Sequence, residues 1–256
     1  MYSNFHTHTY LCGHAAGEPF EYVENAIKNH IEILGFSDHV PYPFPNGYIS
    51  GVRMRMEQTE SYIDMILNLR EKYRSKIKIY IGYEAEYYPQ LFKNMLENIQ
   101  KFECDYLILG QHFLENEYEH SIYSGNVHNN KDLMIKYIDQ VIDAIKTEKF
   151  TYIAHPDLMA FRDDDVFYME QAERLCICAK KLSVPLEINM LGLTDHRAYP
   201  YDKFWEVARQ VGNDVIIGCD AHSPEAVGNP ESVKLAEDYA SKFGFKPIRL
   251  PEFKKV

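Results

Sequence analysis

FHTHTYLCGH, residues 5–14, places three histidines at the end of the first apolar segment. Residues 2–8 alternate in the manner of a strand, so His6 and His8 point to the same side and can share one cation. Two ligands alone do not close a metal site, and two surface histidines are the alternative interpretation of an isolated pair. Any further ligands must come from later in the chain.

The rest of the chain alternates short apolar runs with longer amphipathic ones. We predict strands over residues 2–8, 33–37, 77–81, 105–109, 152–154, 185–189 and 215–218. Helices are predicted over residues 19–30, 54–73, 89–102, 132–148, 166–182, 201–211 and 231–243. This alternation indicates an α/β fold with a parallel sheet, and seven strand–helix units favour closure into a barrel. The polar segment 115–130 is predicted to be a lid or a substrate loop.

Composition limits the class of partner. One domain of 256 residues is as plausible as two smaller ones, and no shift in composition marks a linker. The net charge of −11 argues against nucleic acid or an anionic membrane as the main partner, because a phosphate backbone requires a basic stripe. An acidic chain can still bind a small phosphorylated metabolite where cations lie in its pocket.

The cysteines and the apolar runs bear on location. Five cysteines lack the spacing of a disulfide framework, the N-terminus has no basic and apolar leader, and no apolar run reaches about 18 residues. We therefore expect a cytoplasmic protein without a membrane span. The oligomeric state stays open.

Seven of the eleven histidines fall in the first strand-end segment or at the ends of other predicted strands. In a parallel barrel these strand ends meet at one face, where ligands bind. Glu84 and Glu86 share a strand face, so either is a candidate ligand, whereas Asp220 lies two residues before His222 and repeats the spacing of His6 and His8. Imidazoles with a minority of carboxylates suit Zn, Fe or Mn. Four histidines lie outside the motifs, and we expect their side chains to be solvated or hydrogen-bonded to nearby residues: His30, His120, His128 and His196.

An ordered set of motifs covers essentially the whole chain: HTHT at 6–9, SDH at 37–39, GYEAE at 82–86, GQH at 110–112, AHPD at 154–157 and CDAH at 219–222. Together they resemble the PHP (polymerase and histidinol phosphatase) superfamily. LCGHA at 11–15, RMRM at 53–56, EIN at 187–189 and SPEAVG at 223–228 resemble its monofunctional histidinol-phosphate phosphatase branch.

The resemblance implies a single domain over residues 1–256, a distorted seven-stranded (β/α) barrel, with three divalent metal ions (Zn, Fe or Mn). One ion would take His6, His8, Glu84 and Asp220. A second would share Glu84 and take His112 and His155, and a third would take His14, His39 and His222.

The implied activity is the hydrolysis of L-histidinol phosphate, in histidine biosynthesis. A hydroxide that bridges two ions, held through Glu84 and Asp220, would attack phosphorus, and no phosphoenzyme is expected. The alternatives are a phosphoesterase for another small metabolite, a nucleotide or phosphotyrosine, and a metal-binding module without turnover.

Two departures from the family pattern concern the substrate. Cys219 stands where relatives usually have Ser, and Thr194 follows Gly192-Leu193 where Arg is common. Four arginines are candidates to bind the phosphate, because a planar guanidinium suits it: Arg162, Arg197, Arg53 and Arg55. The alternative for each is an ordinary surface arginine.

Overall fold

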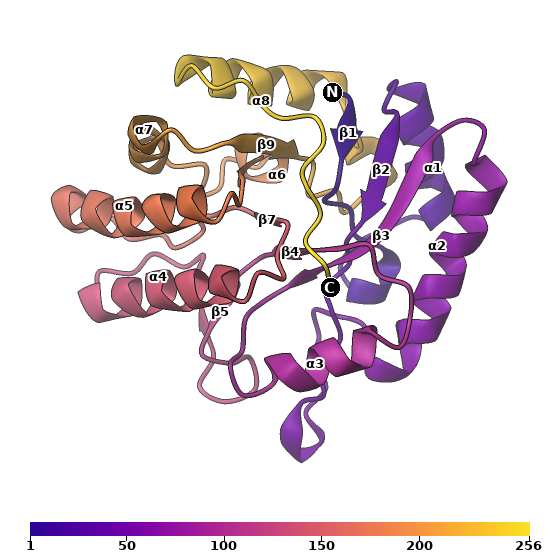
Figure 1. The fold of residues 1–256 in the computed structure, drawn as a ribbon, viewed down its shortest axis with the longest axis horizontal. Helices are drawn as coiled ribbons and strands as arrows, with labels where there is room; N and C mark the ends of the chain where they lie inside the picture. The colour runs from indigo at the N-terminus through magenta and orange to yellow at the C-terminus, as the bar shows by residue number, and fades with distance from the viewer.

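Seven parallel strands form the centre of the computed structural model, which describes residues 1–256 (Figure 1). They follow one another around the sheet in chain order, every pairing is parallel, and the predicted strands are all present. The strands are β1 (Ser3–Asn4), β2 (Ile33–Phe36), β3 (Lys78–Ala85), β4 (Tyr106–Leu109), β7 (Tyr152–Ile153), β8 (Leu186–Asn189) and β9 (Val215–Gly218). The predicted barrel class is confirmed.

Eight helices surround the strands as an outer layer (Figure 1). Local signals set several of their ends: Pro19 opens the first helix, the Asn130 side chain caps the fourth, and Gly212 in the left-handed region ends the seventh. The helices are α1 (Pro19–Lys28), α2 (Thr59–Tyr73), α3 (Phe92–Ile99), α4 (Lys131–Lys146), α5 (Asp165–Lys181), α6 (Met190–Thr194), α7 (Asp202–Val211) and α8 (Pro230–Lys242). Their apolar faces pack on the outside of the strands in one cluster of 58 buried residues.

A short helix and two short strands were not predicted. Helix α6 has five residues, too few to show a helical period, and begins where the Asn189 side chain accepts from the Gly192 N–H at 2.8 Å. The segment predicted as a loop contains β6 (Ile122–Tyr123), which pairs antiparallel with β5 (Phe113–Leu114). This β5–β6 hairpin lies at the end of the barrel where the predicted ligands converge.

The ring closes where the residues after β1 meet those after β9. Thr7 pairs with Ala221 in a parallel bridge, and the His8 N–H donates to the Ala221 carbonyl at 2.9 Å. The Ala221 N–H donates in turn to the His6 carbonyl at 3.2 Å. This closure places His6, His8 and Asp220 beside one another.

The C-terminal segment covers the opposite end of the barrel. In Figure 1 it leaves α8 and crosses the middle of the strands. The Ile248 N–H donates to the Val215 carbonyl at 2.8 Å, which anchors the segment to β9. Farther on, the Phe253 ring enters the barrel's interior aromatic cluster, with ring centroids 4.8, 5.2 and 5.5 Å from those of Tyr80, Tyr106 and Phe5. No helix in the structure is both long enough and apolar enough to cross a membrane.

Candidate metal centre

Glu84, the penultimate residue of β3, lies at the middle of the predicted ligand set. Its Oε2 is 3.2 Å from His39 Nδ1, 3.4 Å from His6 Nε2 and 3.5 Å from His8 Nε2. Its Oε1 is 2.9 Å from His155 Nε2 and 3.6 Å from His112 Nε2. Five imidazoles from four strand ends therefore face one carboxylate.

Asp220 extends this cluster on the side of β9. Its Oδ1 is 3.2 Å from His8 Nε2 and 3.4 Å from His6 Nε2. Beyond it, His222 Nε2 lies 3.0 Å from His14 Nε2, and both belong with His39 to a group whose ligand atoms lie within 4.8 Å of one another. The structure thus brings together all nine residues named as ligands from the sequence.

The donor atoms fit bound cations. Nitrogens of His6, His8, His39 and His155 are buried without a hydrogen-bond partner, although unpaired buried polar atoms are rare in proteins. Those of His6, His8 and His39 that face Glu84 do so at 3.2–3.5 Å, and neutral imidazoles with carboxylates are typical ligands of Zn, Fe and Mn. A divalent cation would satisfy these nitrogens and compensate the buried negative charge.

Hydrogen-bond acceptors behind the cluster contact the ring nitrogens that point away from its centre. His6 Nδ1 lies 2.8 Å from Glu187 Oε1, and His112 Nδ1 lies 3.1 Å from Glu86 Oε1. His14 Nδ1 is 3.0 Å from the Cys12 carbonyl. A proton on each of these nitrogens leaves the other ring nitrogen free to coordinate a cation, as in other metal sites.

Sequence reasoning missed the role of Glu187. It is part of the EIN motif, is fully buried in β8 and also accepts from the His155 N–H at 3.1 Å. The available signal was a carboxylate between the apolar residues Leu186 and Ile188 of a predicted strand. For the Glu84/Glu86 alternative, the structure places Glu84 among the imidazoles and Glu86 behind His112.

The electrostatics of the cluster attract positive charge. Burial opposes ionisation of Glu84 and Asp220, but the surrounding imidazoles, among them His6 beside both, hold the pKa of each carboxyl well below its usual range. Burial lowers the pKa of His6, yet the charges of Glu187, Asp220 and Glu84 outweigh burial and raise that pKa well above normal. Burial and the neighbouring His8 lower the pKa of His222 to about 3. The two carboxylates are therefore ionised and His222 is neutral, as coordination of a cation requires.

Backbone geometry after the strands directs two of the candidate ligands. His155 and Asp220 have φ values of 31° and 51°, in the left-handed region that non-glycine residues seldom adopt. Gly110 and Gly218 make room for the carboxylates, because a Cβ at Gly110 would lie 1.9 Å from Glu84 Oε1, and one at Gly218 would lie 1.7 Å from Glu187 Oε1. Bare backbone at both positions lets these carboxylates reach their partners.

A cavity of about 530 Å³ opens onto the cluster. Besides the ligands, it is lined by the aromatic rings of Phe113, Tyr123 and Tyr199 and by the charged pair Asp195 and Arg197. Arg197 donates to Asp195 Oδ2 and to the Tyr199 hydroxyl, each at 3.2 Å. The cavity therefore combines a cation, an anion and aromatic surface beside the ligand cluster.

Of the four arginines considered for phosphate, Arg197 is the one that lines this cavity. The guanidinium of Arg162 stacks over the Tyr201 ring at 3.6 Å and donates to backbone carbonyls. Arg53 is buried and bound by protein carboxylates, and Arg55 is exposed beside a separate pocket. Of the four, Arg197 alone therefore lies in the cavity beside the ligand cluster.

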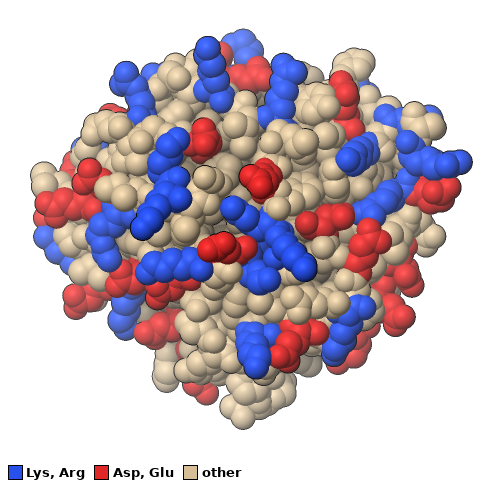
Figure 2. Space-filling view, in the orientation of Figure 1, with Lys and Arg blue, Asp and Glu red and all other residues tan.

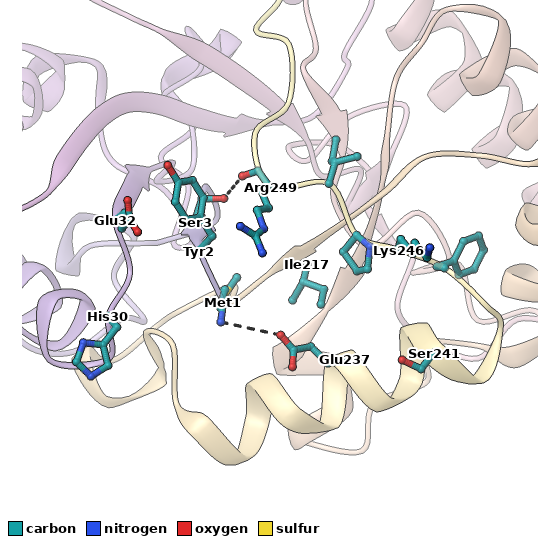
Figure 3. Close-up of a pocket in the computed structure, with 13 residues that line it drawn as sticks. Met1, Tyr2, Ser3, His30, Glu32, Ile217, Glu237, Ser241, Lys246 and Arg249 are labelled. Atoms are coloured by element: carbon teal, nitrogen blue, oxygen red, sulfur yellow. Dashed lines mark hydrogen bonds and ion pairs between the residues drawn. The ribbon is translucent and has the colours of Figure 1, made fainter.

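A larger pocket, about 660 Å³, lies at the other end of the barrel, beside the C-terminal segment (Figure 3). Glu237 and the N-terminal amine are 4.0 Å apart there, and the charged side chains of Glu32, Lys246 and Arg249 are exposed around it. Figure 2 shows the same face with acidic and basic side chains interspersed. This pocket holds no cluster of ligand atoms comparable with the one around Glu84.

Two known proteins are similar in sequence to this chain over most of its length. The "Probable histidinol-phosphatase" of Deinococcus radiodurans is 31% identical over 238 residues, 87% of each chain. The histidinol-phosphatase of Bacillus subtilis is 24% identical over 253 residues, covering 87% of this chain and 94% of its own.

A crystal structure of histidinol phosphate phosphatase from Lactococcus lactis, complexed with Zn, L-histidinol and phosphate, shares the fold. Its TM-score is 0.75 at 19% identity, over 99% of this chain and 97% of that one. The sequence model of the PHP domain matches residues 4–190, which include the first two strand-end histidines, Glu84 and His155. With that match over most of its length and a relative at 31% identity, the chain belongs to the PHP domain family.

Proposed function

We propose that this protein is a metal-dependent phosphomonoesterase that hydrolyses L-histidinol phosphate to L-histidinol and phosphate. The observation that carries the proposal is the convergence of seven imidazoles and two carboxylates beside a cavity of about 530 Å³ that holds Arg197. The name of the 31% identical Deinococcus relative supports the choice of substrate.

Three divalent ions would be held by the ligands at the strand ends. Two observations support this number: the triad of His14, His39 and His222 forms one compact group, and Glu84 faces four imidazoles outside this triad through its two oxygens. We assign one ion to His6, His8, Glu84 and Asp220, one to Glu84, His112 and His155, and one to His14, His39 and His222. Bound divalent ions supply positive charge, which acidifies water and offsets the charge of the phosphate.

The protein side chains hold the cations and orient the imidazoles, and no side chain is needed as a nucleophile. Glu84 and Asp220 stay ionised and bind the cations, while Glu187 and Glu86 orient His6 and His112. Cys12 is near His8 and His222, but burial raises the pKa of its thiol to about 12, so the thiol stays protonated. Water is therefore the acceptor of the phosphoryl group in the proposed reaction.

The cavity matches the three functional groups of the substrate. L-Histidinol phosphate carries a phosphate, an ammonium group and an imidazole ring. Arg197 would contact the phosphate, the Asp195 carboxylate would accept from the ammonium, and Tyr123 and Tyr199 offer aromatic surface for the ring. A phosphate ester without an amine would leave Asp195 paired only with Arg197.

The test combines metal analysis with phosphate release. Purified protein should contain at least two ions of Zn, Fe or Mn per chain and release phosphate from L-histidinol phosphate in preference to a panel of sugar phosphates, nucleotides and phosphotyrosyl peptides. His8→Ala and chelation should each abolish turnover, whereas His30→Asn, at an exposed left-handed position that Asn tolerates, should not. Preference for another ester would keep the chemistry and change the substrate. Bound metal without any turnover would indicate a binding module.

We also propose that residues 1–256 act as one catalytic unit in the cytoplasm. The proposed ligands run from His6 to His222, so neither half of the chain contains the full set. The five cysteines are unpaired, in keeping with a reducing compartment.

A further inference from the structure

Arg53 is the centre of a buried charge network next to the metal centre. Its side chain is 1% exposed and its five N–H donors all have acceptors. Two donors form a bidentate pair with Glu86, at 2.9 Å each, and two point to Glu117 Oε2. The fifth reaches the Val40 carbonyl at 3.1 Å. No N–H of this guanidinium is left for a phosphate.

The network continues into the ligand cluster through a single carboxylate. Glu86 Oε1 accepts from Arg53 Nη2 and lies 3.1 Å from His112 Nδ1. The carboxylate that Arg53 fixes is thus the acceptor beside His112 Nδ1. A proton on Nδ1 leaves Nε2 free, and this nitrogen faces Glu84 at 3.6 Å.

The same guanidinium joins three separate segments of the chain. Arg53 belongs to the loop between β2 and α2, Glu86 directly follows β3, and Glu117 belongs to the β5–β6 hairpin loop. Neighbours of Arg53 and Glu117 line the cavity, since Val52 precedes Arg53 and the hairpin contributes Phe113 and Tyr123. The rings of Tyr42 and Phe44 pack on the guanidinium at 5.6 and 5.9 Å, which excludes water from the network.

We infer that Arg53 is a positioning residue: through Glu86 it orients His112 toward the metal centre, and through Glu117 it holds the β5–β6 hairpin at the cavity. It does not bind the phosphate. The inference rests on the metal-binding part of the proposed function and is independent of the identity of the phosphate ester.

Arginine is the side chain that this geometry requires. A lysine carries the same charge but has no planar fork, so it cannot bind Glu86 through two parallel hydrogen bonds and Glu117 at the same time. Glu117 is 3% exposed, so loss of Arg53 leaves two buried carboxylates without their common cation. Glu86 then lacks the two hydrogen bonds that fix its carboxylate, so the acceptor that orients His112 Nδ1 is no longer held in place.

The test measures metal affinity without turnover. Wild-type protein, Arg53→Met, Arg53→Lys and Glu117→Gln are titrated with Zn²⁺ or Mn²⁺ against a competing chelator, and Arg209→Met, exposed on α7, is the matched control. We expect both Arg53 variants to lose about 10- to 100-fold in affinity for one ion of the set, as for other residues behind a metal ligand. Glu117→Gln should show a smaller loss for the same ion, and Arg209→Met none.

A second measurement separates positioning from direct contact. With metal at saturation, the inhibition constant of inorganic phosphate for Arg53→Lys should stay within about threefold of the wild-type value, because Arg53 does not contact phosphate. If Arg53 did bind phosphate, this constant would rise by roughly tenfold or more. Unchanged affinity for every ion in folded Arg53→Lys and Glu117→Gln would overturn the inference. So would weaker phosphate binding with normal metal affinity, which indicates direct contact. If Arg53→Met does not fold, Arg53→Lys and Glu117→Gln decide. Because metal titration needs no substrate, a wild-type protein inactive on L-histidinol phosphate leaves these results interpretable.

Discussion

Gly110→Ala probes how closely the backbone approaches Glu84. The new Cβ would lie 1.9 Å from Glu84 Oε1 and 2.5 Å from its Cδ, whereas ordinary contact begins at 3.4 Å. The carboxylate must therefore withdraw by about 1.5 Å. It cannot do so without leaving its partners, because the same Oε1 lies 2.9 Å from His155 Nε2.

The magnitude follows from that displacement. A misplacement of about 1 Å in a catalytic constellation typically costs about 100-fold in rate, so kcat/KM should fall by at least about 100-fold, equivalent to about 2.7 kcal/mol. Crowding of this kind also costs about 1–3 kcal/mol of folding stability. The assays are steady-state phosphate release, metal content and urea unfolding. Gly51→Ala is the control, because a Cβ there meets nothing within 4 Å.

One result would refute the reasoning. If Gly110→Ala folds, retains its full metal content and keeps kcat/KM within about threefold of wild type, then the bare backbone at residue 110 does not determine where Glu84 lies. A loss of stability alone, with activity intact in the folded fraction, would equally refute it.

Three further predictions concern other parts of the molecule. Glu187→Gln should weaken metal binding by about 10- to 100-fold, because His6 loses its anionic partner, and chelator competition measures this. Arg197→Ala should raise KM for the phosphate ester by about tenfold or more, whereas Arg162→Ala, removed from the cavity, should leave KM unchanged; equal effects in steady-state kinetics would argue against the assignment. Phe253→Ala should lower the free energy of unfolding by about 2 kcal/mol, less than for a fully buried ring, while kcat stays unchanged, and urea unfolding would contradict this if the midpoint did not move.

Much of the site was predictable because its parts lie in regular places along the chain. Most strands are short apolar runs, and a candidate ligand lies two or three residues beyond the strand end, as at His39, His112 and His155. Parallel strands send these ends to one face, so local patterns together with a simple topology rule sufficed. The first strand was harder to delimit: β1 has two residues, and the extended stretch that follows is held to the residues after β9 by Thr7.

The roles of Arg53 and Glu187, which lie behind the candidate ligands, were not predictable, because they depend on contacts between distant residues. RMRM and EIN contain charged side chains whose sequence neighbours do not distinguish a surface arginine from Arg53, or a solvated glutamate from Glu187. Burial and partners decide between these interpretations. Glu187 meets His6 across 181 positions of the chain, and no local pattern encodes such a meeting.

The amino-acid sequence by itself determined the α/β alternation, the strand ends and the set of imidazoles and carboxylates available to cations, because hydrophobic period and residue chemistry are local properties. Only the tertiary structure decided that Glu84 rather than Glu86 faces the imidazoles, that Arg53 is enclosed by protein carboxylates, and that Arg197 lines the cavity. The physical reason is that barrel closure and side-chain packing bring together groups from distant segments, and the partners found there set each charge and orientation.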